Sequence, residues 1–207
     1  MTSELIFYTN PMSRGQTIRW MLEEVGEPYD TEILDYATTL KREPYLSINP
    51  MGKVPAIKHG DSVITEVAAI CTYLADEFPD RKLNIPVGTP RRGEYLKWLF
   101  FGPSVIEPAM TDRAFPRKEN PRAASVGWRD FDQVLDIVSK VVAKGPYLTG
   151  EQFTAADLVI GSGLRYGMMF KLIPERKEFI DYVARVVTRP AAQRAEAKDK
   201  ELGAQAA

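Results

Sequence analysis

The chain contains 207 residues, and its 27 basic and 28 acidic side chains leave a formal net charge of −1. This length is enough for one large domain or two small domains with cores of their own. The balanced charge, without a basic stripe, argues against nucleic acid as a partner. No apolar run approaches the ~20 residues that cross a bilayer, and the first four residues do not resemble a signal peptide. We therefore expect a cytoplasmic protein with no membrane partner.

The lone cysteine and the lone histidine limit the chemistry of any site. With Cys71 alone no intrachain disulfide can form, which fits a reducing compartment. Its helical spacing with Val67 and Leu74 predicts a buried side chain. With His59 alone we expect no histidine-based metal site and no metal cofactor.

The N-terminal third predicts a small α+β domain. A buried strand at residues 4–8 is followed by a helix at 14–25, which Gly26 ends, and by a second strand at 29–33. Strand, helix and strand with short connections form a βαβ unit with a parallel strand pair. After an irregular segment with one possible short helix, the pattern predicts a hairpin of strands 54–57 and 61–64 and then a helix at 66–77.

The hairpin and the helix after it contain two sets of backbone groups that indicate a site. Pro55 has no N–H to donate to a strand ladder, so groups beside it remain available to a ligand. The helix that opens at Thr65 and Glu66 presents further N–H groups and a partial positive charge. Together they suggest a site for a small peptide-like anion.

The second half of the chain is helical in pattern. Residues 79–90 hold three prolines and a glycine and read as a linker. We therefore expect an N-terminal domain at residues 1–78, this linker, and an all-α domain at 91–207. The predicted helices of that domain are residues 91–110, 121–144, 155–170, 176–187 and 190–201.

Three motifs in order resemble the cytosolic glutathione transferase family, in its bacterial form. They are NPxGxVPxI at residues 49–57, I-T-E at 64–66, and F-T-x-A-D at 153–157. The resemblance covers essentially the whole chain and implies a thioredoxin-like N-terminal domain (βαβ–ββα) followed by an all-helical domain. It also implies glutathione as co-substrate, a homodimer and a role in detoxification. In the family the third motif is structural, and Thr154 with Asp157 resembles a capping box.

The resemblance assigns glutathione contacts residue by residue. In the family the proline matching Pro55 is cis, and the backbone of the preceding residue, here Val54, pairs with the cysteinyl part. Glu66 matches the acidic residue that meets the γ-glutamyl end, but Val67 replaces the serine that usually follows it. The lost hydroxyl contact is worth about 1–2 kcal/mol, and Thr65 is a partial substitute.

Each of these assignments has a structural alternative. Pro55 also fits a bulge or an edge strand, and Glu66 also fits a first-turn glutamate favoured by the helix dipole. Lys53 is expected either to contact the glycine carboxylate or to be solvated. Arg14 would add favourable charge near the thiol.

Three residues are candidates to activate the thiol: Ser13, Tyr8 and Asn10. Ser13 follows Tyr8 by five positions at the mouth of the first helix, as in serine-type members of the family. It also matches a capping box with Gln16, and the two roles are compatible. Lowering a thiol pKa by two units needs roughly 2.7 kcal/mol. A hydrogen bond to a charged group supplies roughly 1.5–3 and a helix N-terminus roughly 0.3–1.

The sequence thus predicts a glutathione transferase that joins the glutathione thiolate to an apolar electrophile. The alternatives are a glutathione-dependent peroxidase, dehalogenase or ether-cleaving enzyme on the same site, or a non-catalytic binding or regulatory protein. The electrophile would lie in an apolar pocket of the helical domain. Candidate lining residues are Trp98, Phe101, Met110, Phe115, Tyr166, Met169 and Phe170.

Overall fold

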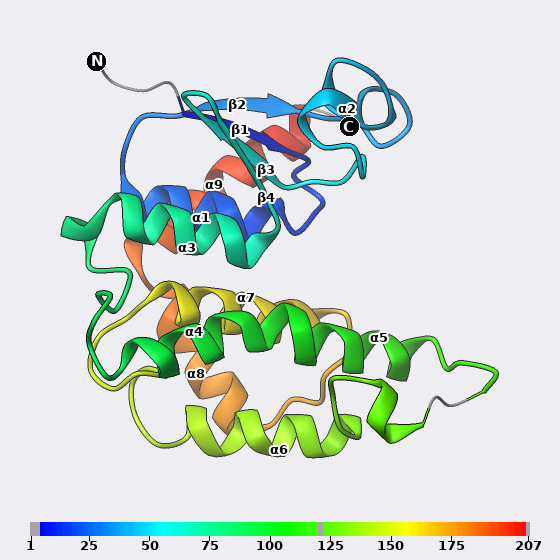
Figure 1. Cartoon of the computed structure of the whole chain (residues 1–207), viewed down its shortest axis with the longest axis vertical. Coiled ribbons are helices and arrows are strands. Elements are labelled where there is room, and N and C mark those ends of the chain that lie inside the picture. Colours follow the sequence, from blue (N-terminus) through cyan, green and yellow to red (C-terminus); the bar gives the residue numbers. More distant parts are fainter. Residues whose placement is uncertain (1–4, 120–121, 206–207) are drawn as a thin grey trace. The chain divides into compact units, whose positions relative to one another are not determined.

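The computed structural model describes residues 5–119 and 122–205 and divides into two compact units. The first unit combines the chain up to Arg81 with the segment from Pro190 onward, and the second runs from Lys82 to Arg189 (Figure 1). The predicted domain division places residues 190–207 with the helical domain, whereas the described residues from Pro190 onward group with the N-terminal unit. None of the described helices is long and apolar enough to cross a membrane.

The first unit has the βαβ–ββα order that the sequence predicts. Its four strands lie in the order β2-β1-β3-β4, with β1 parallel to β2 and antiparallel to β3, and β3 antiparallel to β4. Helices α1 and α3 pack against each other, and α9 packs along α1 (Figure 1). The elements are β1 (Leu5–Thr9), α1 (Gly15–Val25), β2 (Asp30–Ile33), α2 (Tyr45–Ile48), β3 (Ala56–His59), β4 (Ser62–Thr65), α3 (Val67–Glu77) and α9 (Pro190–Gln205).

Local sequence accounts for these elements. Alternate residues of β1 are buried, as expected for a strand that lies between two others. Helix α1 buries the apolar residues that lie at helical spacing, Ile18, Met21, Leu22 and Val25. It ends where Gly26 adopts a left-handed conformation, with φ of 72°. The N–H of Gly26 donates to the carbonyl of Leu22 at 2.8 Å. Cys71 is fully buried in α3, as predicted, and burial raises the pKa of its thiol.

The predicted strand at residues 54–57 is wrong at its beginning, because β3 starts only at Ala56. Pro55 has no N–H for the ladder, and the Val54–Pro55 peptide bond is cis. The hydrogen-bonded register therefore begins one residue after the proline.

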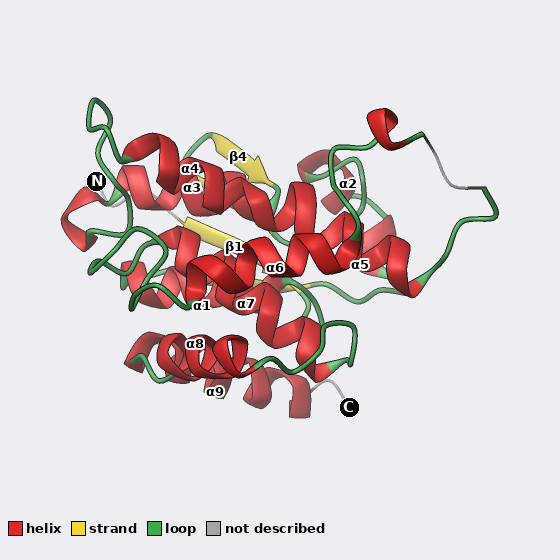
Figure 2. Cartoon of the chain, turned by 90° about the horizontal axis from the view of Figure 1, so that it is seen from below, coloured by secondary structure: helices red, strands yellow, loops and turns green. Residues whose placement is uncertain are grey.

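The named elements that the structure describes in the second unit are all helices, while the described strands lie in the first unit (Figure 2). The predicted helix at 91–110 is interrupted by a short π-helix at Gly102–Ile106, because Pro103 has no N–H to continue the α-helical ladder. The predicted helix at 121–144 begins only at Phe131, where the Asp130 carboxylate accepts from the N–H of Asp132. The helices are α4 (Arg92–Phe101), α5 (Glu107–Ala114), α6 (Phe131–Val142), α7 (Ala155–Met169) and α8 (Lys177–Val187).

A buried carboxylate anchors the start of α7. The capping box of Thr154 and Asp157 is present, as predicted. Asp157 is fully buried and accepts from the backbone N–H of Leu148 at 2.7 Å and from the Tyr182 hydroxyl at 2.9 Å. It also accepts from the N–H and the hydroxyl of Thr154, both at 2.9 Å. Burial raises the pKa of Asp157, and these four donors oppose the shift.

Candidate functional site

Three predicted segments meet at one edge of the sheet. Tyr8 pairs with Ala56, and Ala56 pairs with Thr65, so these residues form one row across β1, β3 and β4. The loop at 10–13 follows this row on β1, the Val54–Pro55 step precedes it on β3, and Glu66 follows it on β4. The half-buried Thr65 closes the row on β4.

The loop before β3 is fixed so that Val54 stays outside the ladder. The carbonyl of Lys53 accepts from the Tyr45 hydroxyl and from the side-chain amide of Asn49, the latter at 2.8 Å. The backbone N–H and carbonyl of Val54 have no hydrogen-bond partner among the described residues. The half-buried side chains of Val54 and Tyr8 pack against one cluster of buried residues, and the Lys53 side chain is exposed. That cluster is Leu34, Leu40, Tyr45 and Ala56.

The turn from β4 into α3 is strained and leaves a helix end open. Glu66 is exposed and adopts φ 68° and ψ 123°, a conformation that costs a non-glycine residue about 1–3 kcal/mol. Its side chain makes no cap, and the first backbone bond of the helix runs from Ile70 N–H to the Glu66 carbonyl. The N–H groups of Val67, Ala68 and Ala69 therefore have no acceptor among the described residues. This end of α3 is suited to bind an anion.

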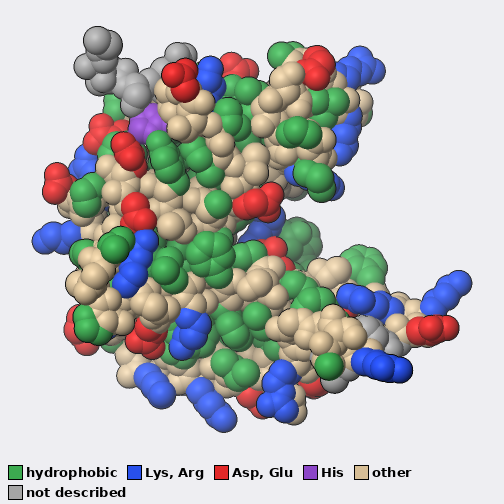
Figure 3. Space-filling view, viewed as in Figure 1, with side chains coloured by type: hydrophobic (Ala, Val, Ile, Leu, Met, Phe, Trp, Pro, Cys, Tyr) green, Lys and Arg blue, Asp and Glu red, His purple; other side chains and the backbone are tan. Residues whose placement is uncertain are grey.

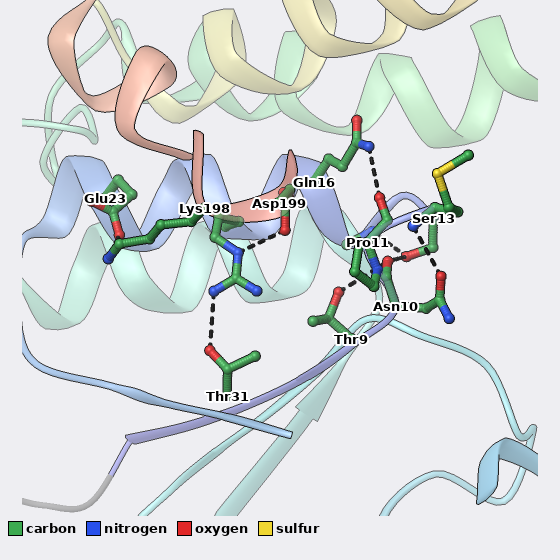
Figure 4. A network of polar contacts seen from close by, with 12 residues as sticks. Thr9, Asn10, Pro11, Ser13, Gln16, Glu23, Thr31, Lys198 and Asp199 are labelled. Atoms are coloured by element: carbon green, nitrogen blue, oxygen red, sulfur yellow. Dashed lines mark hydrogen bonds and ion pairs between the residues drawn. The ribbon is translucent and has the colours of Figure 1, made fainter. Parts of the chain in front are cut away.

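The loop after β1 is held by its own side chains. The Ser13 hydroxyl donates to the Asn10 carbonyl at 2.6 Å and accepts from the Gly15 N–H at 2.9 Å. The Asn10 amide donates to the Leu34 carbonyl at 2.8 Å and accepts from the Met12 N–H at 2.9 Å. Figure 4 shows Asn10 beside Ser13 in this loop. Asn10 therefore acts here as a structural link between two loops.

The predicted capping box of Ser13 and Gln16 is wrong. Helix α1 begins at Gly15 with Arg14 at the N-cap position, so Ser13 lies one residue too early to cap Gln16. The Gln16 side chain donates instead to the Pro11 carbonyl at 2.7 Å. The backbone N–H of Gln16 donates to the Ser13 carbonyl at 3.3 Å. This N–H is therefore paired with a backbone carbonyl and not with the Ser13 side chain.

Gly15 was not predicted as a site residue, yet it sets the geometry of this loop. A Cβ on Gly15 would lie 1.9 Å from the Thr9 hydroxyl oxygen and 2.9 Å from that of Ser13. The close packing of α1 against the end of β1 therefore requires glycine. No spacing rule in the sequence signals this contact.

We expect Gly15→Ala to destabilise the protein by about 1–3 kcal/mol, because the added methyl overpacks this contact. Thr9→Ala in the same chain should restore more than half of the loss, since its Cβ would remain 3.1 Å away. Urea unfolding of both variants measures this. Gly93→Ala is the matched control, because a Cβ there meets nothing within 4 Å. A double variant no more stable than Gly15→Ala would contradict the assignment.

The predicted electrophile-pocket residues all lie in the second unit but differ in exposure. Trp98 and Met110 are buried, Phe101 and Tyr166 are half-buried, and the other three are exposed. Two pairs of rings are in contact. The ring centroids of Trp98 and Phe101 lie 5.2 Å apart, and those of Tyr166 and Phe170 lie 4.6 Å apart. The three exposed residues are Phe115, Met169 and Phe170. The pocket as a whole stays a prediction.

Charge and metal chemistry add little to the site. On the face shown in Figure 3, basic and acidic side chains are interspersed. Within the part of the chain that the structure describes, no group of three or more His, Cys, Asp or Glu side chains is placed to bind a metal ion.

Comparison with known proteins identifies the family. Residues 12–77, from the loop before α1 to the end of α3, match the family model of the glutathione S-transferase N-terminal domain. The chain is 30% identical to glutathione S-transferase GstA of Escherichia coli O157:H7 over 153 residues, which covers 73% of this chain and 76% of GstA. The chain belongs to the glutathione S-transferase family.

Two further proteins are similar to this glutathione S-transferase family member over a larger part of its chain. It is 30% identical to the glutathione S-transferase-like protein OpS6 of Beauveria bassiana, over 84% of this chain and 85% of OpS6. A crystal structure of a glutathione transferase from Methylococcus capsulatus has a TM-score of 0.78 and 30% identity, over 95% of this chain and 98% of that one. The fold predicted from the sequence, thioredoxin-like followed by all-helical, is thus confirmed.

Proposed function

We propose that this protein is a glutathione transferase that binds glutathione at the edge of the sheet formed by Val54, Glu66 and the loop carrying Ser13. One observation carries the proposal: unpaired backbone groups of Val54 and of the first turn of α3 lie at the same edge of the sheet. A peptide-like anion is the ligand that would satisfy both sets. Membership of the family, whose relatives are named glutathione S-transferases, makes glutathione the expected peptide.

The dimensions of the edge support a tripeptide. Neighbouring strands are about 4.8 Å apart, so the row from β4 through β3 to β1 spans about 10 Å. A tripeptide in extended form also spans about 10 Å. We propose that the γ-glutamyl end lies at Glu66, the cysteinyl backbone pairs with Val54, and the sulfur faces the Ser13 loop. The exposed Lys53 is placed on the loop beside Val54, where its ammonium suits a carboxylate.

The γ-glutamyl end carries an ammonium and a carboxylate, and the start of α3 offers a partner to each. Glu66 would meet the ammonium, and the N–H groups of Val67 and Ala68 would meet the carboxylate. Thr65, half-buried at the end of β4, would supply the hydroxyl that Val67 lacks.

Ser13 is the proposed group that stabilises the thiolate. Its hydroxyl proton now bonds to the Asn10 carbonyl, so turning to sulfur exchanges one hydrogen bond for another. A neutral bond contributes roughly 0.5–1.5 kcal/mol and a bond to a charged group roughly 1.5–3. The exchange thus favours the thiolate by about 1 kcal/mol, or roughly 0.7 of a pKa unit. Tyr8 packs its ring against Tyr45, with centroids 5.7 Å apart, and Asn10 holds the loop. Ser13 is therefore the strongest of the three candidates.

The thiolate would attack an electrophilic carbon of an apolar substrate bound by aromatic and methionine side chains of the second unit. As the carbon–sulfur bond forms, the leaving group, such as the halide of an aryl halide, departs with the electron pair of its bond to carbon. A peroxidase, dehalogenase or ether-cleaving reaction uses the same activated thiol and is the second enzymatic candidate. We also expect the protein to form a homodimer, as is usual in the family.

A different class, a non-catalytic binding protein, is favoured by two observations. The Ser13 proton is already hydrogen-bonded, and Val67 stands where the family has serine. Two measurements separate the classes: calorimetric titration with glutathione, and turnover of a generic aryl halide with glutathione. Binding together with turnover supports the proposed transferase. Binding without turnover of any electrophile supports the binding protein, and absence of glutathione binding overturns both enzymatic candidates.

Glu66→Gln should weaken glutathione binding about two- to fivefold, because an exposed ion pair is worth up to about 1 kcal/mol. Calorimetry measures the affinity of both proteins. The matched control is Glu77→Gln at the other end of α3, which should bind like the wild type. Equal affinities for Glu66→Gln and wild type would remove Glu66 from the ligand site.

A further inference from the structure

The C-terminal helix α9 packs along α1 with very small side chains. The buried face of α9 is formed by Ala191, Ala192 and Ala195, followed by Asp199. Methyl groups alone give little apolar contact area, so polar contacts must supply much of the specificity of this packing.

The central polar contact joins residues from opposite ends of the chain. Arg19 of α1, 2% exposed, donates from Nε to the Asp199 carboxylate, 7% exposed, at 2.8 Å. The same guanidinium donates to the Thr31 hydroxyl at 3.0 Å and lies 5.0 Å from the ring centroid of Phe7 (Figure 4). Arg19 therefore connects α9 to α1, β2 and β1.

A second contact holds the start of α9. Glu23, one turn beyond Arg19 on α1, is 7% exposed and accepts from Arg194 at 3.1 Å and from Lys198. Burial by itself would raise the pKa of Glu23, but hydrogen bonds from Lys198, Tyr29 and Arg194 lower it. Glu23 thus stays ionised and paired at neutral pH.

The last turns of α9 reach the loop that carries Ser13. A Cβ on Gly203 would lie 4.0 Å from the Cβ of Pro11. The Pro11 carbonyl accepts from Gln16 of α1, and Ser13 follows two residues later. Helix α9 therefore contacts α1 at Glu23 and Arg19, and its last turns lie beside the loop before α1.

We propose that Asp199 is a positioning residue that, through Arg19 and the end of α9, fixes the beginning of α1 and the loop that presents Ser13. This inference rests on the proposed function for its catalytic consequence. Its structural consequence, that the order of residues 10–15 depends on Asp199, does not rest on the proposed function.

The test replaces Asp199 with asparagine, which keeps the shape and removes the charge. The matched control is Glu196→Gln, which breaks an exposed ion pair with Lys200 on the same helix. Hydrogen exchange of the Met12 and Gly15 amides, which donate to Asn10 and Ser13, should become at least about threefold faster in Asp199→Asn only. Unchanged exchange at these amides overturns the proposal, whether or not the protein is a transferase.

Kinetics test the catalytic consequence. In Asp199→Asn we expect kcat with an aryl halide to fall about three- to tenfold at pH 7, with KM for glutathione changed less than about twofold. The thiol pKa of bound glutathione should rise, and Asp199→Glu should restore part of the loss. In a Ser13→Ala background Asp199→Asn should cause no further fall, because the two act as a unit. Wild-type kcat and thiol pKa in Asp199→Asn would overturn this role. A wild type without turnover would instead show that the proposed function has failed.

Discussion

Ser13→Ala is expected to lower turnover at pH 7 about five- to tenfold while glutathione binding largely survives. The hydroxyl favours the bound thiolate by about 1 kcal/mol or more, and loss of 1.36 kcal/mol raises the thiol pKa by about one unit. Because the thiolate is the reactive form, the rate would then increase only at correspondingly higher pH. Ultraviolet absorbance of the thiolate against pH, in the complexes of both proteins, measures the shift.

The control for this variant is Ser62→Ala, an exposed serine of β4. It should leave both the thiol pKa and the turnover unchanged. If the thiol pKa is the same in Ser13→Ala and wild type, Ser13 has no part in the mechanism. Tyr8 would then become the residue to replace next, because Asn10 already uses both ends of its amide.

Asp157→Ala is expected to lower the free energy of unfolding by about 3–5 kcal/mol. The substitution removes the acceptor of four buried hydrogen bonds and leaves donors of Leu148, Thr154 and Tyr182 without partners. Each buried donor left unpaired costs about 1–3 kcal/mol. Urea unfolding followed by circular dichroism measures the loss.

Asp181→Ala is the comparison for this prediction, since Asp181 forms an exposed ion pair with Lys177 on α8. It should change stability by less than about 0.5 kcal/mol. Similar losses in the two variants would contradict the role assigned to the buried network. Glutathione affinity of folded Asp157→Ala should be unchanged, because the carboxylate lies in the second unit.

The parts of the fold that could be predicted are those that depend on the spacing of residues close together in the sequence. The short apolar run of β1, the helical spacing of apolar residues in α1 and the Thr154–Asp157 box each depend on residues within a few positions of one another. The errors also have local causes. Pro55 delays the start of β3, and Pro103 introduces a short π-helix where the apolar pattern continues as if the helix were regular.

The backbone geometry of the candidate site was predictable around Pro55 and Glu66 and less so around Ser13. The motif around Pro55 and Glu66 marks backbone groups whose availability follows from proline and helix-end chemistry. The S-x-x-Q pattern predicts that the Ser13 hydroxyl accepts from the Gln16 N–H. In the structure it accepts from the Gly15 N–H and donates to the Asn10 carbonyl. The contact of Arg19 with Asp199 spans 180 positions and has no local signal.

The packing of α9 on α1 also orders events during synthesis. The ribosome releases β1 to α3 first and then the whole second unit, and only the last residues of the chain supply α9. Since translation adds about 5–20 residues per second, the nascent first unit exposes the α9-facing side of α1 for several seconds. Until α9 has been made, Arg19 and Glu23 keep this side of α1 charged and hydrated, which disfavours nonspecific apolar association. The first unit thus starts to be made before the second unit but receives helix α9 after it. The charged side of α1 is suited to this interval of exposure.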